Sequence, residues 1–185
     1  MFIDSFVNLV SSSYTSNLGT HSGEVLEALC LRDDIRTVVE VGVSDGKLSN
    51  YLLAQIPTLY LYGVDIESNE CIRAVYDNFS NRSVFFERDS VEVAQFLANG
   101  MFDLVFVDAD HTYDAVVRDL RAWAPKVRPG GIFAGHDYGW EFPGVVRAVQ
   151  EFALATGWRL QTSASNVWWF YKPNATVDKQ ACFLQ

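Results

Sequence analysis

The sequence predicts an α/β fold, a doubly wound sheet of seven strands that is mostly parallel and ends in an antiparallel hairpin, with helices on both faces. Short β-branched or aromatic runs alternate with amphipathic stretches of roughly ten residues, the pattern of parallel strands joined by crossover helices. The last two strand-like runs are separated only by residues 163–166. A gap that short permits a hairpin but no crossover, so at least one terminal strand must be antiparallel.

The elements can be assigned in order along a single domain. A helix begins at Ser22, where polar residues precede apolar ones at helical spacing. Strands are then expected at Thr37–Val41, Leu59–Val64, Val84–Arg88, Leu104–Val107, Gly131–Ala134, Arg159–Thr162 and Val167–Tyr171. Helices are expected between them at Lys47–Gln55, Ser68–Phe79, Val91–Ala98, Tyr113–Ala124 and Val145–Thr156. We expect a lead-in at residues 1–22, a core at 23–172 and a tail at 173–185.

Composition narrows the class of protein. The 185 residues are 49% hydrophobic and carry a formal net charge of −9, which fits a folded domain and argues against disorder. An acidic chain without a basic cluster lacks the electrostatic attraction for nucleic acid or an anionic membrane. No leader-like segment and no apolar run near the roughly 18 residues of a membrane helix is present. We therefore expect a cytoplasmic protein that binds neither nucleic acid nor a membrane.

The cysteines and aromatic residues suggest little beyond this. Three cysteines lie far apart, which fits a reducing compartment, and Cys30 and Cys71 are expected to be buried thiols. Exposed aromatic side chains would permit a homodimer, which is left open.

The most informative segment follows the first strand. It consists of Glu40-x-Gly42-x-x-x-Gly46 and then becomes helical. Glycines there let the backbone turn and present its N–H groups at the sheet edge, where nucleotide-like ligands bind. The spacing is not the G-x-G-x-x-G of dinucleotide sites, which argues against a nicotinamide-dependent dehydrogenase.

Acids also follow the second and third strands. Asp65 ends the second, where its carboxylate can accept both ribose hydroxyls of a cofactor lying on the Gly42 turn. Asp89 and Ser90 follow the third. Either can simply cap the next helix, while Asp89 can also accept from an adenine amino group and Ser90 can contact the ring. The capping and binding roles can coexist.

Together with Asp108-Ala-Asp110 after the fourth strand, these motifs resemble class I S-adenosylmethionine-dependent methyltransferases. Residues 39–43, 102–110 and 129–138 resemble the small-molecule O-methyltransferases of the catechol and caffeoyl-CoA type. The likeness runs from about Ser22 to Trp169 and implies a Rossmann-like fold. It also implies S-adenosylmethionine as cofactor, bound by Glu40, Gly42, Ser44, Gly46, Asp65, Asp89, Ser90 and Asp108. Ser44 stands where many relatives carry another glycine, so the turn is expected to sit slightly differently over the cofactor's amino-acid end.

Acids and histidines also follow the fourth and fifth strands, and these are Asp108, Asp110, His111, His136 and Asp137. Such a set could bind a divalent ion, with oxygen ligands favouring magnesium or manganese. The resemblance maps two metal ligands onto Asp108 and Asp137. Its third ligand falls on Tyr138, a poor ligand for magnesium, so His136 or Asp110 is the alternative.

His111 occupies the place where the caffeoyl-CoA type carries a lysine near the reacting oxygen. An imidazole there can remove a hydroxyl proton as the methyl group transfers, with Asp108 beside it. The alternative is that His111 only caps the helix that begins near Tyr113, and His136 is a second candidate base. Four aromatic residues, Trp140, Phe142, Trp168 and Trp169, could line an apolar pocket for the acceptor. For Trp168 and Trp169, packing in the core is the favoured interpretation.

We therefore expect a methyltransferase that moves a methyl group from S-adenosylmethionine to a small-molecule acceptor, by preference a hydroxyl oxygen. One alternative is a cofactor-binding protein of the same fold without methyl-transfer activity. The other is a diverged metal-dependent tailoring enzyme.

Overall fold

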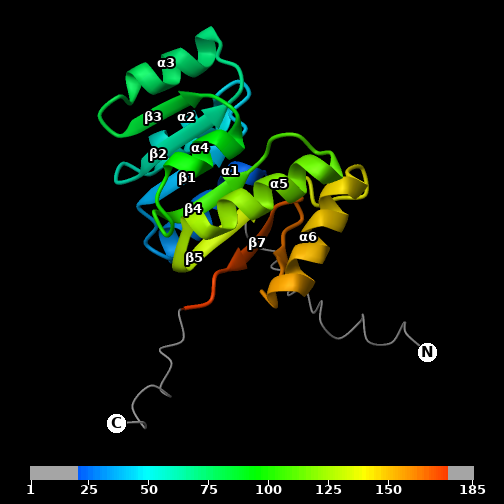
Figure 1. The fold of residues 1–185 in the computed structure, drawn as a ribbon. Helices are drawn as coiled ribbons and strands as arrows, with labels where there is room; N and C mark the ends of the chain where they lie inside the picture. Colours follow the sequence, from blue (N-terminus) through cyan, green and yellow to red (C-terminus); the bar gives the residue numbers. More distant parts are fainter. Residues whose placement is uncertain (1–20, 175–185) are drawn as a thin grey trace, which may run out of the picture.

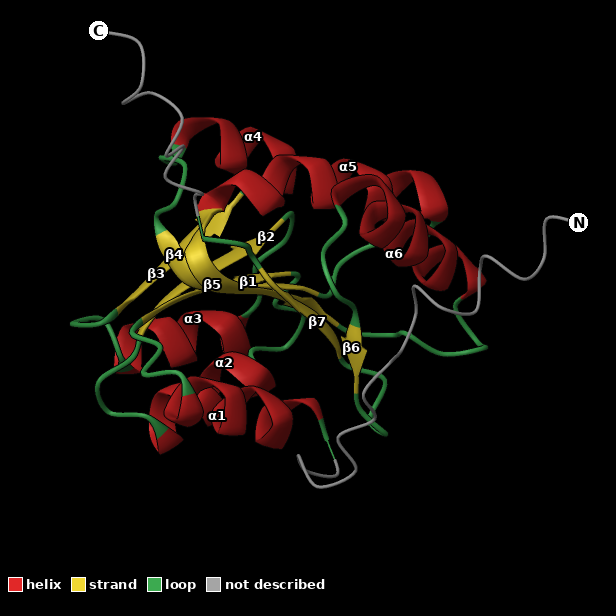
Figure 2. Cartoon of the chain, turned by 90° about the horizontal axis from the view of Figure 1, so that it is seen from below, coloured by secondary structure: helices red, strands yellow, loops and turns green. Residues whose placement is uncertain are grey.

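The computed structural model describes residues 21–174, which form one seven-stranded sheet between two layers of helices (Figure 1). Most of the predicted lead-in and tail lies outside the described residues. Figure 2 shows helices on both faces of the sheet. One layer contains α1 (Ser22–Arg32), α2 (Lys47–Gln55) and α3 (Glu70–Asn78), and the other contains α4 (Ser90–Phe96), α5 (Tyr113–Trp123) and α6 (Pro143–Thr156). A short 3₁₀ turn, η1 (Ala124–Lys126), follows α5.

The strand order is β3-β2-β1-β4-β5-β7-β6, and only the terminal pairings are antiparallel, β5 with β7 and β7 with β6. The strands are β1 (Thr37–Val41), β2 (Tyr60–Asp65), β3 (Ser83–Glu87), β4 (Phe102–Val107), β5 (Val127–Gly135), β6 (Gln161–Thr162) and β7 (Trp168–Tyr171). The order reverses between β1 and β4, and in sheets of this kind a crevice opens at the carboxyl ends of the strands at such a point. The topology thus places the Gly42 turn beside Asp108.

The predicted seven strands, antiparallel terminal hairpin and two helical layers are confirmed. The largest difference is in β5, which begins at Val127 rather than at Gly131. Its register against β4 shifts, because Phe102 pairs with Val127 whereas Leu104 pairs with Ile132. The Pro-Gly-Gly segment, which has the composition of a turn, is therefore an irregularity inside a strand.

Strand residues alternate between the two helical layers. In β1, Val39 and Val41 pack with the side chains of α4–α6, while Val38 packs with those of α1 and α2. This alternation directs Glu40 toward the α1–α3 layer, where most of its neighbours in the core are apolar. A buried carboxyl group in that position needs partners of its own.

The sequence favoured burial of four side chains, two tryptophans and two cysteines. Trp168 and Trp169 are both buried in the core, as was favoured for them, on opposite faces of the sheet. Cys30 is buried as expected. The expectation for Cys71 is wrong, because it lies on the exposed side of α3, whose buried face is formed by Ile72 and Tyr76.

A carboxylate ties the amino ends of the central strands together. Oδ2 of Asp103 at the start of β4 accepts hydrogen bonds from the backbone N–H groups of Arg36 (2.9 Å) and Thr37 (2.8 Å), where β1 begins. Its Oδ1 pairs with Arg128 near the start of β5 at 2.5 Å. Although burial acts in the opposite direction, the hydrogen bonds from Arg128, Thr37 and Arg36 hold the pKa of Asp103 below its usual range. We refer to this group as the Asp103 clamp.

At the opposite end, Gly135 allows β4, β5 and β7 to approach closely. A Cβ atom there would lie 2.3 Å from the Trp168 indole and 2.5 Å from the carbonyl oxygen of Val107. The Trp168 indole N–H donates to the carbonyl of His136 at 3.0 Å. This packing holds the ends of β4 and β5 together, immediately before Asp108 and Asp137.

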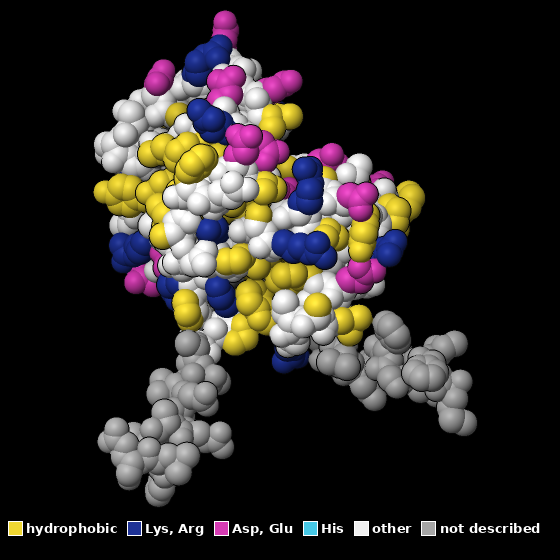
Figure 3. All heavy atoms as spheres, viewed as in Figure 1, with side chains coloured by type: hydrophobic (Ala, Val, Ile, Leu, Met, Phe, Trp, Pro, Cys, Tyr) yellow, Lys and Arg dark blue, Asp and Glu magenta, His cyan; other side chains and the backbone are white. Residues whose placement is uncertain are grey.

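The surface view in Figure 3 shows basic side chains interspersed with acidic and apolar ones over the α4–α6 face, without a continuous basic patch on that face. Within residues 21–174, every helix is too short or too polar to cross a membrane.

We predict that Gly135→Ala destabilises the fold by about 1–3 kcal/mol, because the added methyl group meets a rigid indole and a backbone oxygen. Gly139→Ala is the matched control, since the atoms nearest to its Cβ would belong to the flexible side-chain amide of Asn166, at 3.1 Å. Urea unfolding measures both free energies. Equal stability of the two variants would contradict the packing described for Gly135.

Candidate active site

The turn after β1 is shaped by close packing against β4. Gly42 has a φ of +90°, and a Cβ atom there would lie 2.1 Å from the carbonyl oxygen of Asp108, so no other residue fits. Its N–H donates to the carbonyl of Val64 at 2.8 Å. Gly46 is the residue that precedes the first turn of α2. The turn therefore lies directly over the switch point of the sheet.

Asp65 at the end of β2 holds this turn. Its Oδ2 accepts from the backbone N–H groups of Val43 (2.8 Å) and Ser44 (2.9 Å), and its Oδ1 accepts from the N–H of Glu67 at 3.2 Å. Ser44 has a φ of +55°, the left-handed conformation that favours glycine. Its carbonyl accepts from the side-chain amide of Asn69 at 2.8 Å. These partners on β2 and before α3 hold a non-glycine residue in a glycine-like conformation.

Two pockets open on either side of the turn and share Gly42, Ser44, Asp108 and Ala109. The first has a volume of about 580 Å³ and is lined by residues that include His21, Gly23, Glu40, Lys47, Tyr51 and His111. The second has a volume of about 530 Å³ and is lined by residues that include Asp65, Ile66, Asp89, Ser90, Arg118 and Asp119. Each volume is in the range of small-molecule sites. Because they share the turn, the two pockets form one elongated groove.

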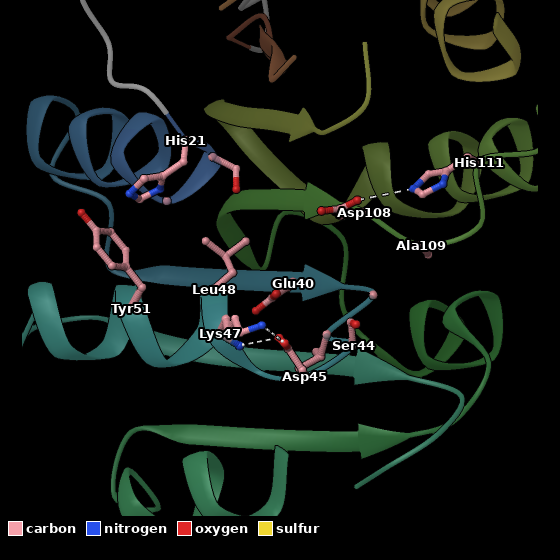
Figure 4. Close-up of a pocket in the computed structure, with 14 residues that line it drawn as sticks. His21, Glu40, Ser44, Asp45, Lys47, Leu48, Tyr51, Asp108, Ala109 and His111 are labelled. Atoms are coloured by element: carbon pink, nitrogen blue, oxygen red, sulfur yellow. Dashed lines mark hydrogen bonds and ion pairs between the residues drawn. The ribbon is translucent and has the colours of Figure 1, made fainter. Parts of the chain in front are cut away.

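Figure 4 shows the first pocket, with Asp108 and His111 at one end and His21 and Tyr51 at the other. The His21 and Tyr51 rings meet edge to face at 5.4 Å, and the Tyr51 hydroxyl donates to Glu27 at 2.6 Å. The α1 and α2 helices both begin at this pocket, so their N-terminal ends favour a negatively charged ligand group there.

Glu40 lies beneath the turn and is only 2% exposed. Its carboxyl group accepts a short hydrogen bond from the hydroxyl of Ser49 in α2, and Ser49 Oγ lies 2.9 Å from the hydroxyl of Tyr76 in α3. Burial raises the pKa of Glu40 to about 8, the carboxylates of Asp108 and Asp65 add to the rise, and the Ser49 hydrogen bond opposes it. Glu40 is thus mostly protonated at neutral pH.

The second pocket contains the acid and the hydroxyl predicted after β3. Oδ1 of Asp89 caps α4 by accepting from the N–H groups of Val91 (2.9 Å) and Glu92 (3.1 Å). The hydroxyl of Ser90 donates to Asp119 in α5. Asp89 therefore caps α4 and also lines the second pocket.

The histidine and two of the acids predicted after β4 and β5 converge. Nε2 of His111 lies 2.7 Å from Oδ2 of Asp137 and 3.6 Å from Oδ1 of Asp108, and one ligand atom of each residue lies within 4.8 Å of the others. This Nε2 atom is buried and forms no well-aligned hydrogen bond with the described residues. Asp137 has a φ of +59°, a strained backbone conformation of the kind found at functional sites. Burial raises the pKa of Asp108, and Asp137 acts in the same direction, while His136 and His111 oppose it.

Of the alternative residues, His136 lies beside the cluster, whereas Asp110 and Tyr138 have other partners. His136 lies between Asp137 Oδ1, 3.1 Å from its Nδ1, and the carbonyl of Ser165, 3.0 Å from its Nε2. Asp110 is exposed and accepts from the N–H of Thr112 at 2.7 Å. The Tyr138 hydroxyl accepts from Gln150 at 3.0 Å. The residue at the N-cap of α5 is Thr112 rather than His111.

The order of these site residues along the chain matches a known family. A family model described as a methyltransferase domain matches residues 39–138, which is more than half of the chain. This range includes the Gly42 turn and the four residues that the two pockets share. The chain belongs to this methyltransferase domain family. The resemblance to class I methyltransferases is confirmed at the level of family and fold.

One curated protein and several solved structures are similar to this chain. An uncharacterized protein of Acanthamoeba polyphaga mimivirus is 30% identical over 139 residues, 67% of this chain and 61% of that protein, so the chain spans less than two thirds of this relative. The Bacillus cereus O-methyltransferase in complex with SAH matches with a TM-score of 0.63 and 16% identity, over 84% of this chain and 85% of that one. The methyltransferase MycE of the mycinamycin pathway, in complex with Mg, SAH and mycinamycin VI, matches with a TM-score of 0.58 and 21% identity, over 77% and 46%. At these identities the structural likenesses show the fold.

Sequence reasoning missed several residues of this methyltransferase domain. Tyr51 and Lys47 enter the first pocket from α2, and Ile66, Arg118 and Asp119 line the second. For Asp119 a signal existed, because it interrupts an otherwise apolar face of α5 formed by Ala115, Val116, Leu120 and Trp123. The pocket positions of α2 carry no comparable signal.

We predict that the contribution of Glu40 to the stability of this domain falls as pH rises from about 4.5 to about 8. The folded pKa lies above the ordinary value, so the folded state binds the proton more tightly than the unfolded chain does, and this contribution is fully present below about pH 4.5. Glu40→Gln keeps an acceptor for Ser49 and removes this ionisation. The difference in unfolding free energy between wild type and variant should change by a few kcal/mol between about pH 5 and pH 9. A pH-independent difference in urea unfolding would contradict the assignment.

Proposed function

We propose that the chain binds S-adenosylmethionine along the groove and transfers its methyl group to a hydroxyl oxygen of a small molecule. The proposal rests chiefly on the two pockets that meet at the Gly42 turn, because their shapes and polar groups fit the two ends of this cofactor. The Bacillus cereus relative holds SAH in the same fold, which supports this choice.

The adenosine part would occupy the second pocket. Oδ1 of Asp65 can accept from the ribose, because a carboxylate oxygen accepts more than one hydrogen bond. Ile66 is 69% exposed beside it and offers an apolar surface that a purine ring would cover. Asp89 and Ser90 lie at the polar edge of this pocket, where the exocyclic amine of adenine would be bound.

The amino-acid part would occupy the first pocket. Asp108 gives that pocket an acidic group suited to the cationic sulfonium and ammonium, and the carboxyl group of Glu40 can accept a hydrogen bond from the ammonium. The N-terminal ends of α1 and α2 suit the carboxylate of the same ligand.

The Asp108–His111–Asp137 cluster also fits a divalent cation. Two carboxylates and a buried imidazole nitrogen without a well-formed hydrogen bond lie close enough to share one ion. We assign Asp108 and Asp137 as the residues that would hold it. A bound magnesium or similar cation would orient the acceptor hydroxyl and ease removal of its proton. The MycE structure holds magnesium as well as SAH, in support of such a group in this fold.

Methyl transfer needs an in-line approach and removal of one proton. The acceptor oxygen forms a bond to the methyl carbon, the carbon–sulfur bond breaks, and its electron pair remains on sulfur. The ring nitrogen of His111 that does not face Asp137 takes the hydroxyl proton. Oδ2 of Asp137, 2.7 Å from Nε2, orients the imidazole from the other side.

The acceptor would lie beside this cluster, under the loop that follows β5. Phe142 packs against the His111 ring with a centroid distance of 4.7 Å, and Trp140 is 88% exposed. An exposed aromatic residue beside a polar reaction centre suits a small molecule with an apolar part.

We predict that Asp65→Ala weakens binding of S-adenosylmethionine and of SAH by at least tenfold, roughly the loss of two hydrogen bonds. Isothermal titration calorimetry measures both affinities. Asp77→Ala, which removes an exposed acid from α3, is the control and should bind like wild type. Absence of binding to the wild-type chain, or unchanged binding to Asp65→Ala, would overturn the cofactor site.

We predict that His111→Ala lowers the rate of SAH formation by roughly 10²–10⁴-fold, the usual contribution of a general base, while SAH affinity stays within about twofold. Turnover is measured with hydroxylated small molecules and magnesium present. Full activity of the variant would exclude His111 as the base. Tight SAH binding without turnover on any acceptor would favour the cofactor-binding alternative.

A further inference from the structure

Asp119 is a buried acid to which the proposed chemistry assigns no part. It lies on the inner face of α5, is 5% exposed, and has the buried apolar neighbours Val116, Leu120 and Trp123 on that face. Its Oδ1 accepts a short hydrogen bond from the hydroxyl of Ser90, at the start of α4. Asp119 and Ser90 both line the second pocket. A buried carboxyl group in this position therefore acts on a residue of the ligand site.

The hydrogen bond determines which role Ser90 can offer to a ligand. A serine hydroxyl has one proton and two lone pairs. While its proton points to the Asp119 carboxylate, Ser90 Oγ can only accept hydrogen bonds from a molecule in the pocket. Asp89 also offers only acceptors, because Oδ1 caps α4 and Oδ2 has no hydrogen bond to the described residues. This edge of the pocket therefore presents acceptors side by side.

We propose that Asp119 makes this pocket selective for a purine that carries an amino group over one that carries an oxo group at the same position, by holding Ser90 as a hydrogen-bond acceptor. The inference rests on the proposed cofactor site and deepens it. The exocyclic amine of adenine donates to Ser90 Oγ, whereas the oxo group of hypoxanthine sets an acceptor against an acceptor. Asp119 is a positioning residue, because it acts through Ser90.

Other charged groups at this end of the groove do not share the role. Arg88, Asp110 and Arg118 line the same pocket, but all three are exposed to solvent. They remain in every variant below, so they affect each measured selectivity alike. Removing the Asp119 carboxylate frees the Ser90 hydroxyl to rotate, and it can then donate to an oxo group.

The test compares the affinities of SAH and S-inosylhomocysteine, its 6-oxo counterpart, by calorimetry at about pH 8, far above the ordinary pKa of an aspartate. We expect wild type to prefer SAH. Asp119→Leu and Ser90→Ala should each reduce this preference about five- to tenfold, the equivalent of one hydrogen bond. The double variant should show no further reduction. Asp119→Asn, whose side-chain oxygen can still accept from Ser90, should restore at least part of the preference.

Asp114→Leu is the matched control, because it removes an exposed acid from the same helix and should keep the wild-type preference. Thermal unfolding of each variant separates selectivity from stability, and Asp119→Ala replaces the leucine variant if that variant does not fold. An unchanged preference in Asp119→Leu or Asp119→Ala, with SAH still bound, would overturn the inference alone. Failure of the wild-type chain to bind SAH would instead overturn the proposed function on which it rests.

Discussion

The site depends on the hydrogen bonds by which Asp65 holds the turn after β1. A turn that must pass within contact distance of Asp108 has no side-chain volume at Gly42, so packing at that position cannot hold it. Instead, a carboxylate from the neighbouring strand accepts two of its backbone N–H groups. The turn then divides the crevice at the switch point into two pockets, and each is completed by residues from strands and helices on its own side.

The fold could be predicted because its signals are local and repeated. Alternating strand and helix patterns, with a short gap between the last two strands, were enough to establish a mixed sheet. The β5 irregularity was not predictable, since Pro129, Gly130 and Gly131 have the composition of a turn and only pairing with β4 makes them part of a strand. Cys71 was misjudged for a similar reason, because helical spacing alone did not show which side of α3 faces the sheet.

The site was predictable to a different extent. Residues that directly follow strands, such as Asp65, Asp89 and Asp108, could be located because parallel strands deliver their ends to one edge of the sheet. The side chains that hold Glu40 and Ser90, by contrast, come from helix interiors. Ser49, Tyr76 and Asp119 reach the site only through the rotation of each helix against the sheet, which one sequence does not specify. The buried hydroxyl and carboxyl groups under the groove therefore became visible only in three dimensions.

A common principle connects the groups beneath the groove. Glu40 and Asp119 are each buried below one pocket, and each accepts a hydrogen bond from a serine of an adjacent helix. An unpaired buried carboxyl group would be destabilising, so these serines contribute to the stability of the fold as well as to the pockets. The polar floor of the groove is held in place by α2 and α3 on one side of the sheet and by α4 and α5 on the other.

The Asp103 clamp has a consequence for how such a chain can change over evolutionary time. It joins β1, β4 and β5 at the edge of the sheet that lies farthest from the groove, through backbone groups and one arginine. Cohesion of the central strands is thus secured independently of the loops that would contact an acceptor. Insertions and substitutions in those loops can therefore accumulate without loss of the sheet. New acceptors could then be acquired while the residues proposed to bind the methyl donor are retained.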